Sequence, residues 1–262
     1  MMKPLRYVDV HIHLSDEEYD DNVDEIISEA IKSNVAFLVS NSMDLETSIK
    51  SLKLSEKYAG TVYAAVGIHP WNVEALSEDQ IQETCQFILK KQSNSAIVAV
   101  GEVGLDYKYD TIWDKQLMVF DEMLHLAEKL SLPVIIHSRG TTAKIVEMLP
   151  SYDLKGVLLH WFSNPLSILP KIIERGYYIS EGPPAVYSGG IREVIRRTPL
   201  TNILTETDGP VRYFKSPFNG KTTTPAFIPA VVKAIAEIKQ VSEADAAGQI
   251  MENCQRFFAV KG

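Results

Sequence analysis

The sequence is poor in cysteine: among 262 residues only Cys85 and Cys254 occur, far apart and in segments of helical pattern. Two such cysteines exclude a disulfide framework, so a reducing compartment, the cytoplasm, is the expected location. The sequence also lacks an apolar run long enough to span a bilayer, and its first residues lack the apolar core and cleavage site of a signal peptide. No membrane partner is therefore expected.

Positive charge is scarce as well, because 26 lysines and arginines stand against 34 aspartates and glutamates, for a formal net charge of -8. A chain of this charge lacks the broad positive field that attracts duplex nucleic acid. Any nucleic-acid partner has to be held locally, by metal ions and a few cations. The sequence also has no glycine-rich dinucleotide fingerprint and no serine in a nucleophile-elbow motif, which argues against a covalent acyl-enzyme.

What the sequence does contain is a regular alternation of apolar runs and amphipathic segments. Between the runs, apolar residues recur at helical spacing, as in 19–31 and 113–127. Strands buried on both faces and alternating with helices form a parallel sheet. One α/β domain, a (β/α)8 TIM barrel over residues 1–262, therefore suits the length and the 45% hydrophobic content. The eight predicted strands are LRYVDVHI, VAFLVS, VYAAVGI, AIVAVGE, PVIIHS, GVLLHW, GYYIS and NILTETD.

Signals for helix starts and loops support this division. Ser77, with Gln80 three residues later, is a capping-box pattern at the start of the third helix. Ser242 opens an extra C-terminal helix that runs through Phe257. The seventh and eighth units are the weakest, because the seventh strand is short and the loop Gly209–Pro225 is long. Long loops at the top of a barrel usually serve the active site.

Four histidines and two carboxylates fall where the expected strands end. His11 and His13 are two apart on one strand, so both imidazoles project to the same side and can share an ion. In (β/α)8 enzymes the carboxyl ends of the strands form the active face. Because burying all six groups without an ion would cost much free energy, the set predicts metal binding. The six residues are His11, His13, Glu102, His137, His160 and Asp208.

Together with their neighbours, these residues form motifs that resemble the TatD family of metal-dependent deoxyribonucleases, within the amidohydrolase-like barrels. The motifs are DVHIHL, VGIHPW, VGEVGLDY, PVIIHSR, HWFSN and TETDGP, followed by a C-terminal helix ending in NCQRFF. The resemblance runs nearly end to end and implies two divalent metal ions. It implies that one ion is held by His11, His13 and Asp208, that the second is held by His137 and His160, and that Glu102 bridges both.

The resemblance also implies a mechanism. Two ions that share a water lower its pKa and polarise a phosphoryl oxygen, so the expected nucleophile is a metal-bridged hydroxide. Asp208 and Glu102 are the expected catalytic residues, with Asp208 as the general base. Mixed nitrogen and oxygen ligands suit Zn, Mn, Co or Ni better than Mg, whereas family members are typically described as Mg-dependent. The sequence leaves the metal open between Zn, Mg and Mn.

Residues around the expected metals are candidates for substrate contacts. For His69 two roles are open: contact with a phosphate or sugar of the substrate, or capping of a loop. For Arg139 they are a clamp on a substrate phosphate, or an ion pair with a neighbouring carboxylate. Arg212 is a third candidate for substrate binding. Asp106 and Tyr107 are expected to orient the metal ligands.

Three other ring residues have simpler interpretations. Trp71 and Trp161 could stack on a base, but packing over the barrel rim is the favoured interpretation for both. His125 lies in a helical segment among charged residues and is expected on the surface.

Departures from the family pattern fall on the substrate-facing segments. The usual HCFSG is HWFSN here, and GPVRYF and KTTTP replace a Ser-Pro-Tyr-Leu run and an Arg-Asn-Glu-Pro motif. The arginine and glutamate of that motif are missing, and Arg212, Lys215 and Lys221 could replace the positive charge. Gly140 stands where the family commonly has aspartate.

Three functions stay open at this point. The leading one is a metal-dependent deoxyribonuclease that cleaves phosphodiester bonds at DNA ends or in single strands. The second is a carboxyl-ester or amide hydrolase, such as the D-aminoacyl-tRNA deacylases known among TatD-like proteins. The third, a catalytically silent binding scaffold, is disfavoured by the complete set of six candidate ligands.

Overall fold

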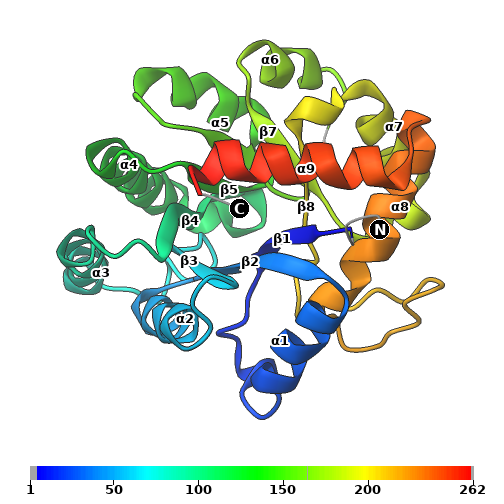
Figure 1. Cartoon of the computed structure of the whole chain (residues 1–262). Helices are drawn as coiled ribbons and strands as arrows, with labels where there is room; N and C mark the ends of the chain where they lie inside the picture. Colours follow the sequence, from blue (N-terminus) through cyan, green and yellow to red (C-terminus); the bar gives the residue numbers. More distant parts are fainter. Residues whose placement is uncertain (1–4, 164, 261–262) are drawn as a thin grey trace. The chain divides into compact units, whose positions relative to one another are not determined.

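The computed structural model describes residues 5–163 and 165–260, and eight strands alternate with helices along them (Figure 1). The strands belong to one sheet in which neighbours follow the order of the chain. Strand order equal to chain order, with helices between the strands, is the (β/α)8 topology. The strands are β1 (Tyr7–Ile12), β2 (Val35–Asn41), β3 (Val62–Val66), β4 (Ile97–Asp106), β5 (Val134–Arg139), β6 (Val157–Leu159), β7 (Tyr178–Glu181) and β8 (Ile203–Thr205).

The chain divides into two compact units, with boundaries after Val39 and after His160. The first unit takes the described residues up to Val39 and from Trp161 onward, and the second is Ser40–His160. The prediction of one domain over residues 1–262 stays a prediction. No helix among residues 5–163 and 165–260 has the length and apolar content needed to cross a membrane.

In the second unit, β3 to β6 pair in parallel, and their inner residues are buried aliphatic side chains. The capping box predicted at Ser77 is confirmed: its hydroxyl accepts a hydrogen bond from the backbone N–H of Gln80, and α3 follows. Helices α2 and α4 pack on β3 and β4. The helices of this unit are α2 (Leu45–Lys57), α3 (Glu78–Lys90), α4 (Trp113–Leu130) and α5 (Thr142–Met148), with the short 3-10 helices η2 (Tyr107–Ile112) and η3 (Leu149–Ser151).

In the first unit, β7 pairs in parallel with β8, and both strands are short, as expected for the seventh. The predicted C-terminal helix is α9 (Glu243–Phe258), which begins after the Ser242 cap, ends one residue later than expected, and lies beside α8 (Figure 1). The other helices of this unit are α1 (Val23–Lys32), α6 (Leu169–Glu174), α7 (Gly189–Arg197) and α8 (Ile228–Lys239), with η1 (Glu17–Tyr19), η4 (Pro183–Val186), η5 (Leu200–Asn202) and η6 (Pro225–Phe227).

One sequence-based prediction about β4 is wrong: the strand does not end at Glu102 but continues to Asp106. The register between β4 and β5 shifts by one residue, because Val100 lies opposite Val134 whereas Val103 lies opposite Ile136. An extra residue of this kind is a β-bulge, which turns a side chain away from its regular direction. The bulge directs the Glu102 carboxylate toward the histidines described below while the strand goes on.

Gly104, also on β4, lies very close to the backbone of β5. A Cβ at this position would lie 2.1 Å from the carbonyl oxygen of His137, and the φ of Gly104 is +150°. Gly104→Ala is therefore expected to push β5 away and to lower the free energy of unfolding by roughly 3 kcal/mol. Urea unfolding measures this loss.

Gly248 in α9 is the matched control for that variant, because a Cβ there meets nothing within 4 Å. Gly248→Ala is expected to raise the free energy of unfolding by about 0.5 to 1 kcal/mol, since alanine favours the helix over glycine. Equal unfolding midpoints for the two variants would contradict the close approach at Gly104.

Candidate metal centre

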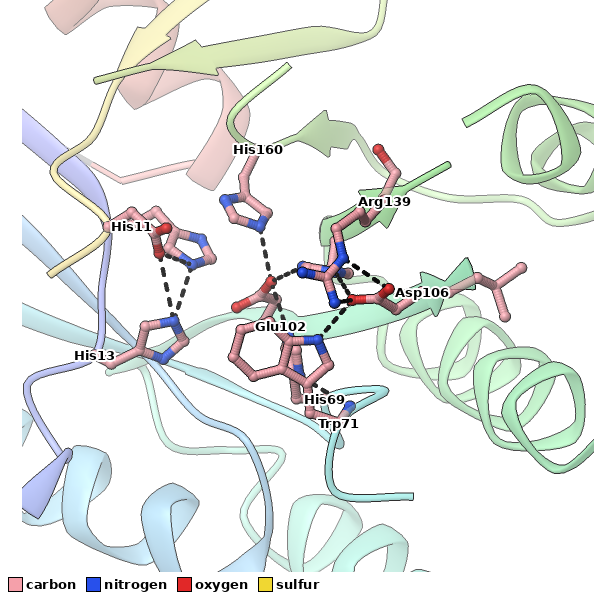
Figure 2. Close-up of polar contacts among 12 residues, drawn as sticks. His11, His13, His69, Trp71, Glu102, Asp106, Arg139 and His160 are labelled. Atoms are coloured by element: carbon pink, nitrogen blue, oxygen red, sulfur yellow. Dashed lines mark hydrogen bonds and ion pairs between the residues drawn. The ribbon is translucent and has the colours of Figure 1, made fainter. Parts of the chain in front are cut away.

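The first group of candidate ligands joins the end of β1 to the residues that follow β8. The Nε2 atoms of His11 and His13 lie 3.3 Å apart. Each lies near the same carboxylate oxygen, Oδ1 of Asp208, at 3.5 Å from His11 and 3.6 Å from His13. Figure 2 shows the His11 and His13 rings turned toward each other. The expectation that the two imidazoles share one side is confirmed.

The spacing of these three donor atoms fits a small divalent ion. Tetrahedral ligands at 2.0 to 2.1 Å from zinc are separated from one another by roughly 3.3 Å. The observed separations of 3.3, 3.5 and 3.6 Å are close to this value. Two imidazoles and a carboxylate also form a mixed nitrogen and oxygen set, which suits Zn or Mn.

Backbone contacts hold this group in place. The N–H of Asp208 donates to the carbonyl of His11, and the N–H of His13 donates to the carbonyl of Gly209, both at 2.8 Å. Asp208 adopts a φ of +50°, a left-handed conformation that aspartate and asparagine tolerate better than most residues. The loop after β8 is thus attached to β1 on both sides of the carboxylate.

Asp9 is a site residue that the sequence analysis missed. It is fully buried, and its carboxylate accepts hydrogen bonds from the backbone N–H of His11 and from the N–H and hydroxyl of Thr207. Burial raises the pKa of Asp9 to about 8, although these hydrogen bonds lower it. The available signal was the period of two on β1, which puts Asp9 on the same face as His11.

The second group gathers three imidazoles around one carboxylate oxygen. Oε1 of Glu102 lies 2.7 Å from Nε2 of His160, 3.0 Å from Nδ1 of His137 and 3.1 Å from Nε2 of His69. Figure 2 shows Glu102 between His160 and His69. The predicted ligands Glu102, His137 and His160 are thus brought together, and His69 joins them. The donor atoms of His69, Glu102 and His137 lie close enough to one another to share a metal ion.

Asp106 supports this group from the far side of His137. Its Oδ2 accepts hydrogen bonds from Nε2 of His137 at 2.9 Å and from the indole N–H of Trp71 at 2.6 Å. Arg139 donates to both oxygens at 2.8 Å. Burial alone would raise the pKa of Asp106, but the hydrogen bonds from His137, Arg139 and Trp71 hold it well below its usual range. Asp106 therefore has the orienting position that the sequence predicted.

The two carboxylates on His137 favour positive charge at that ring. Burial lowers the pKa of His137, but the hydrogen bonds to Asp106 and Glu102 outweigh burial and raise it. A proton can supply this charge, and so can a metal ion on the Glu102 side of the ring. With Nε2 donating to Asp106, Nδ1 is the nitrogen that faces Glu102.

Of the two roles considered for His69, the structure shows the loop-capping one, and the ring also contacts Glu102. Its Nδ1 accepts the backbone N–H of Trp71, which is the loop-capping interpretation, at 3.1 Å. In the neutral ring the proton then lies on Nε2, which faces Glu102. This ring is only 3% exposed, so a substrate contact through it requires an approach along the Glu102 side.

The other candidates for substrate contact, Arg139 and Arg212, contact groups of the protein. Arg139 pairs with Asp106, as the alternative interpretation had it, and its guanidinium lies 5.5 Å from the centre of the Trp71 ring. Arg212 donates to the Glu18 carboxylate and to the carbonyl of Gly220. Within the described part of the chain, Tyr107 makes no hydrogen bond to a candidate metal ligand. Its ring packs edge-on against Trp113.

The remaining ring residues are placed as follows. The indole of Trp71 is 44% exposed, so packing over the rim does not describe it fully. Trp161 packs against Tyr213, with ring centroids 5.9 Å apart. His125 lies on the surface of α4 beside Asp121 and Glu128, as expected.

Comparison with known proteins agrees with this fold. Residues 8–259 match the family described as TatD related DNase. The chain is 32% identical over 257 residues to YabD of Bacillus subtilis, an uncharacterized metal-dependent hydrolase, covering 96% of this chain and 98% of YabD. It is 30% identical to human deoxyribonuclease TATDN3 over 262 residues, 96% of this chain and 94% of that protein. The crystal structure of the TatD homologue YJJV of Escherichia coli superposes with a TM-score of 0.90 at 29% identity, covering 98% and 99% of the two chains.

The chain therefore belongs to the TatD-related DNase family. Both the resemblance noted from the sequence motifs and the (β/α)8 fold class are confirmed. The protein is accordingly a TatD-type hydrolase.

Proposed function

We propose that the protein is a deoxyribonuclease that holds two divalent metal ions and cleaves phosphodiester bonds at DNA ends or in single strands. The observation that carries the proposal is the mutual spacing of the donor atoms, at 3.3 to 3.6 Å in the group of His11, His13 and Asp208. The human relative is named a deoxyribonuclease, which supports DNA as the substrate.

The fold class supports a common site for the two groups of ligands. In (β/α)8 enzymes the carboxyl ends of all strands, with the loops after them, form one face. His11 and His13 are at the end of β1, His137 is on the last half of β5, and His160 directly follows β6. In this proposal His11, His13 and Asp208 would hold one ion, His137 and His160 would hold the second, and Glu102 would be a ligand of both.

The residues have distinct roles in this proposal. Divalent ions in such a set lower the pKa of water and polarise a phosphoryl oxygen. Asp208 accepts the proton of the attacking water and returns it to the leaving alkoxide. Asp106 holds the His137 ring through Nε2, and the N–H of His69 holds Glu102.

The chemistry of the donor atoms supports a choice among the candidate metals. Four imidazoles and two carboxylates favour Zn or Mn over Mg, which prefers oxygen ligands in an octahedral arrangement. We expect Zn and Mn to bind more tightly than Mg when they are compared by titration into protein treated with a chelator.

The substrate is tested with oligonucleotides labelled at the 5′ or the 3′ end, offered as single strands and as duplexes with Mg, Mn and Zn in turn. We expect single strands to be cut faster than the interior of a duplex, because a phosphate has to reach groups that are largely buried. Hydrolysis of a carboxyl ester or an aminoacyl-tRNA, with no DNA cleavage under any metal, would replace this function by the carbonyl hydrolase.

A further inference from the structure

Residues 209–227, the part of the connection between β8 and α8 that follows Asp208, have an unusual charge for this chain. No aspartate or glutamate occurs between Asp208 and Glu237, although acidic residues outnumber basic ones overall. Within this segment three cations occur in the loop, namely Arg212, Lys215 and Lys221. The loop begins directly after Asp208, so its cations lie next in the chain to the proposed general base.

Two buried aromatic residues fix this loop to the first unit. Tyr213 is 4% exposed, and its hydroxyl donates to the carbonyl of Thr207 at 2.7 Å. Phe218 is 3% exposed and packs against Phe227 and Tyr213, with ring centroids 4.7 and 6.0 Å apart. The N–H of Gly220 donates to the carbonyl of Tyr213 at 2.8 Å and closes the loop. Both ends of the segment 213–218 are therefore packed against the first unit.

Phe214 lies between Tyr213 and Phe218 and faces solvent. Its side chain is 77% exposed, which is more than that of any other exposed large hydrophobic residue in the described part of the chain. The ring lies against Gly220, where an added Cβ would meet its Cδ1 and Cε1 at 3.1 Å. Gly220, at a φ of +72°, thus provides a flat backing for one part of the ring. A ring exposed to solvent in this way resembles the aromatic platforms on which unpaired bases stack.

The three cations of the loop differ in whether a carboxylate neutralises their charge. Arg212 pairs with Glu18, so most of its charge is already matched. Lys215 lies over the ring of Tyr187 at 5.4 Å and has no carboxylate partner among the described residues. Lys221 is exposed and likewise has no carboxylate partner within residues 5–163 and 165–260. Lys215 and Lys221 are therefore the cations that can contact an anionic backbone.

We propose that this loop binds single-stranded DNA beside the metal centre, with Phe214 stacking on an unpaired base and with Lys215 and Lys221 contacting phosphates. The proposal rests on the nuclease function proposed above. An isolated phosphate would contact only the lysines and leave Phe214 without a partner. In a duplex the bases are stacked on one another, so Phe214 cannot reach a base face. A single strand supplies both the charge and the free base face, which argues for it over either alternative.

The test measures binding and hydrolysis separately. Binding is followed by fluorescence anisotropy of a labelled oligothymidylate with phosphorothioate linkages, added to metal-loaded protein. Phe214→Leu keeps an apolar side chain without the flat ring, so its Kd is expected to rise roughly 5- to 100-fold, whereas Phe214→Trp restores tight binding. Lys215→Gln and Lys221→Gln are each expected to reduce the slope of log K against log salt by about 0.7.

Two neighbouring residues in the last turn of α1 provide the controls. Ile31 is an exposed apolar residue and Lys32 is an exposed cation. Helices of a (β/α)8 barrel run back from the active face, so their last turns lie at the opposite end. Ile31→Ala and Lys32→Gln are expected to bind the oligonucleotide as the wild type does.

Hydrolysis of bis(4-nitrophenyl) phosphate by the wild type tests the nuclease chemistry without the loop. Wild-type affinity in Phe214→Leu, or a Phe214→Trp variant as weak as the leucine variant, would overturn the stacking proposal even where the small phosphodiester is cleaved. Loss of affinity in Phe214→Leu, with no phosphodiester cleaved under any metal, would leave the loop as a binding site and overturn the nuclease.

Discussion

Replacing Asp208 by asparagine is expected to lower kcat for phosphodiester cleavage by roughly 10²-fold or more, a typical contribution of a general base. Asparagine keeps the shape of the side chain and an oxygen that can face His11 and His13, but it cannot take a proton from water. The left-handed backbone at this position, with a φ of +50°, is tolerated by asparagine. The loss should therefore come from chemistry, while the melting temperature stays near that of the wild type.

Exposed Asp21 is the matched control for this substitution. Asp21→Asn removes the same charge from the same unit and is expected to leave kcat unchanged. The pH profile adds a second readout, since the acidic limb of the wild-type profile should disappear with the base. An Asp208→Asn enzyme with wild-type kcat would remove Asp208 from the general-base role.

Glu102→Gln is expected to weaken metal binding by roughly 10²-fold or more and to lower hydrolysis by a similar factor. The carboxylate is 1% exposed and receives three imidazoles on one oxygen. An amide of the same size has no negative charge and presents an N–H in place of one oxygen, so it cannot hold two cations together. Metal analysis of the purified variant, with bis(4-nitrophenyl) phosphate hydrolysis beside it, measures both effects.

Glu83 on α3 is exposed and serves as the control for that change. Glu83→Gln is expected to keep two ions and full turnover. If Glu102→Gln retained two tightly bound ions and hydrolysed the substrate at the wild-type rate, a bridging role for Glu102 would be wrong.

The sequence predicted most of the fold because local pattern decides it. The apolar runs, the Ser77 capping box and the start of α9 each depend on residues a few positions apart. His11 and His13 were predictable for the same reason, since alternation along a strand settles their direction. The extent of β4 was not predictable from the sequence, because the bulge that turns Glu102 depends on how β4 pairs with β5.

The support around the ligands was predictable only in part, because it depends on contacts between strands. From the sequence, Arg139 could bind a phosphate or pair with a carboxylate. The register between β4 and β5 sets Asp106 opposite Arg139, and the two form an ion pair. Phe214 was missed because nothing in its immediate sequence shows that Tyr213 and Phe218 turn inward while it turns out. An aromatic residue between cations in a long loop is the signal that could have found it.

The most direct test of the metal-dependent nuclease is a titration of protein treated with a chelator. Zn, Mn or Mg is added in turn, bound ions per chain are counted by elemental analysis, and hydrolysis of bis(4-nitrophenyl) phosphate is followed in the same samples. We expect two ions per chain, hydrolysis that rises as the second site fills, and loss of hydrolysis when the chelator returns. Full hydrolysis by the stripped protein, or a protein that binds none of these ions, would contradict the account.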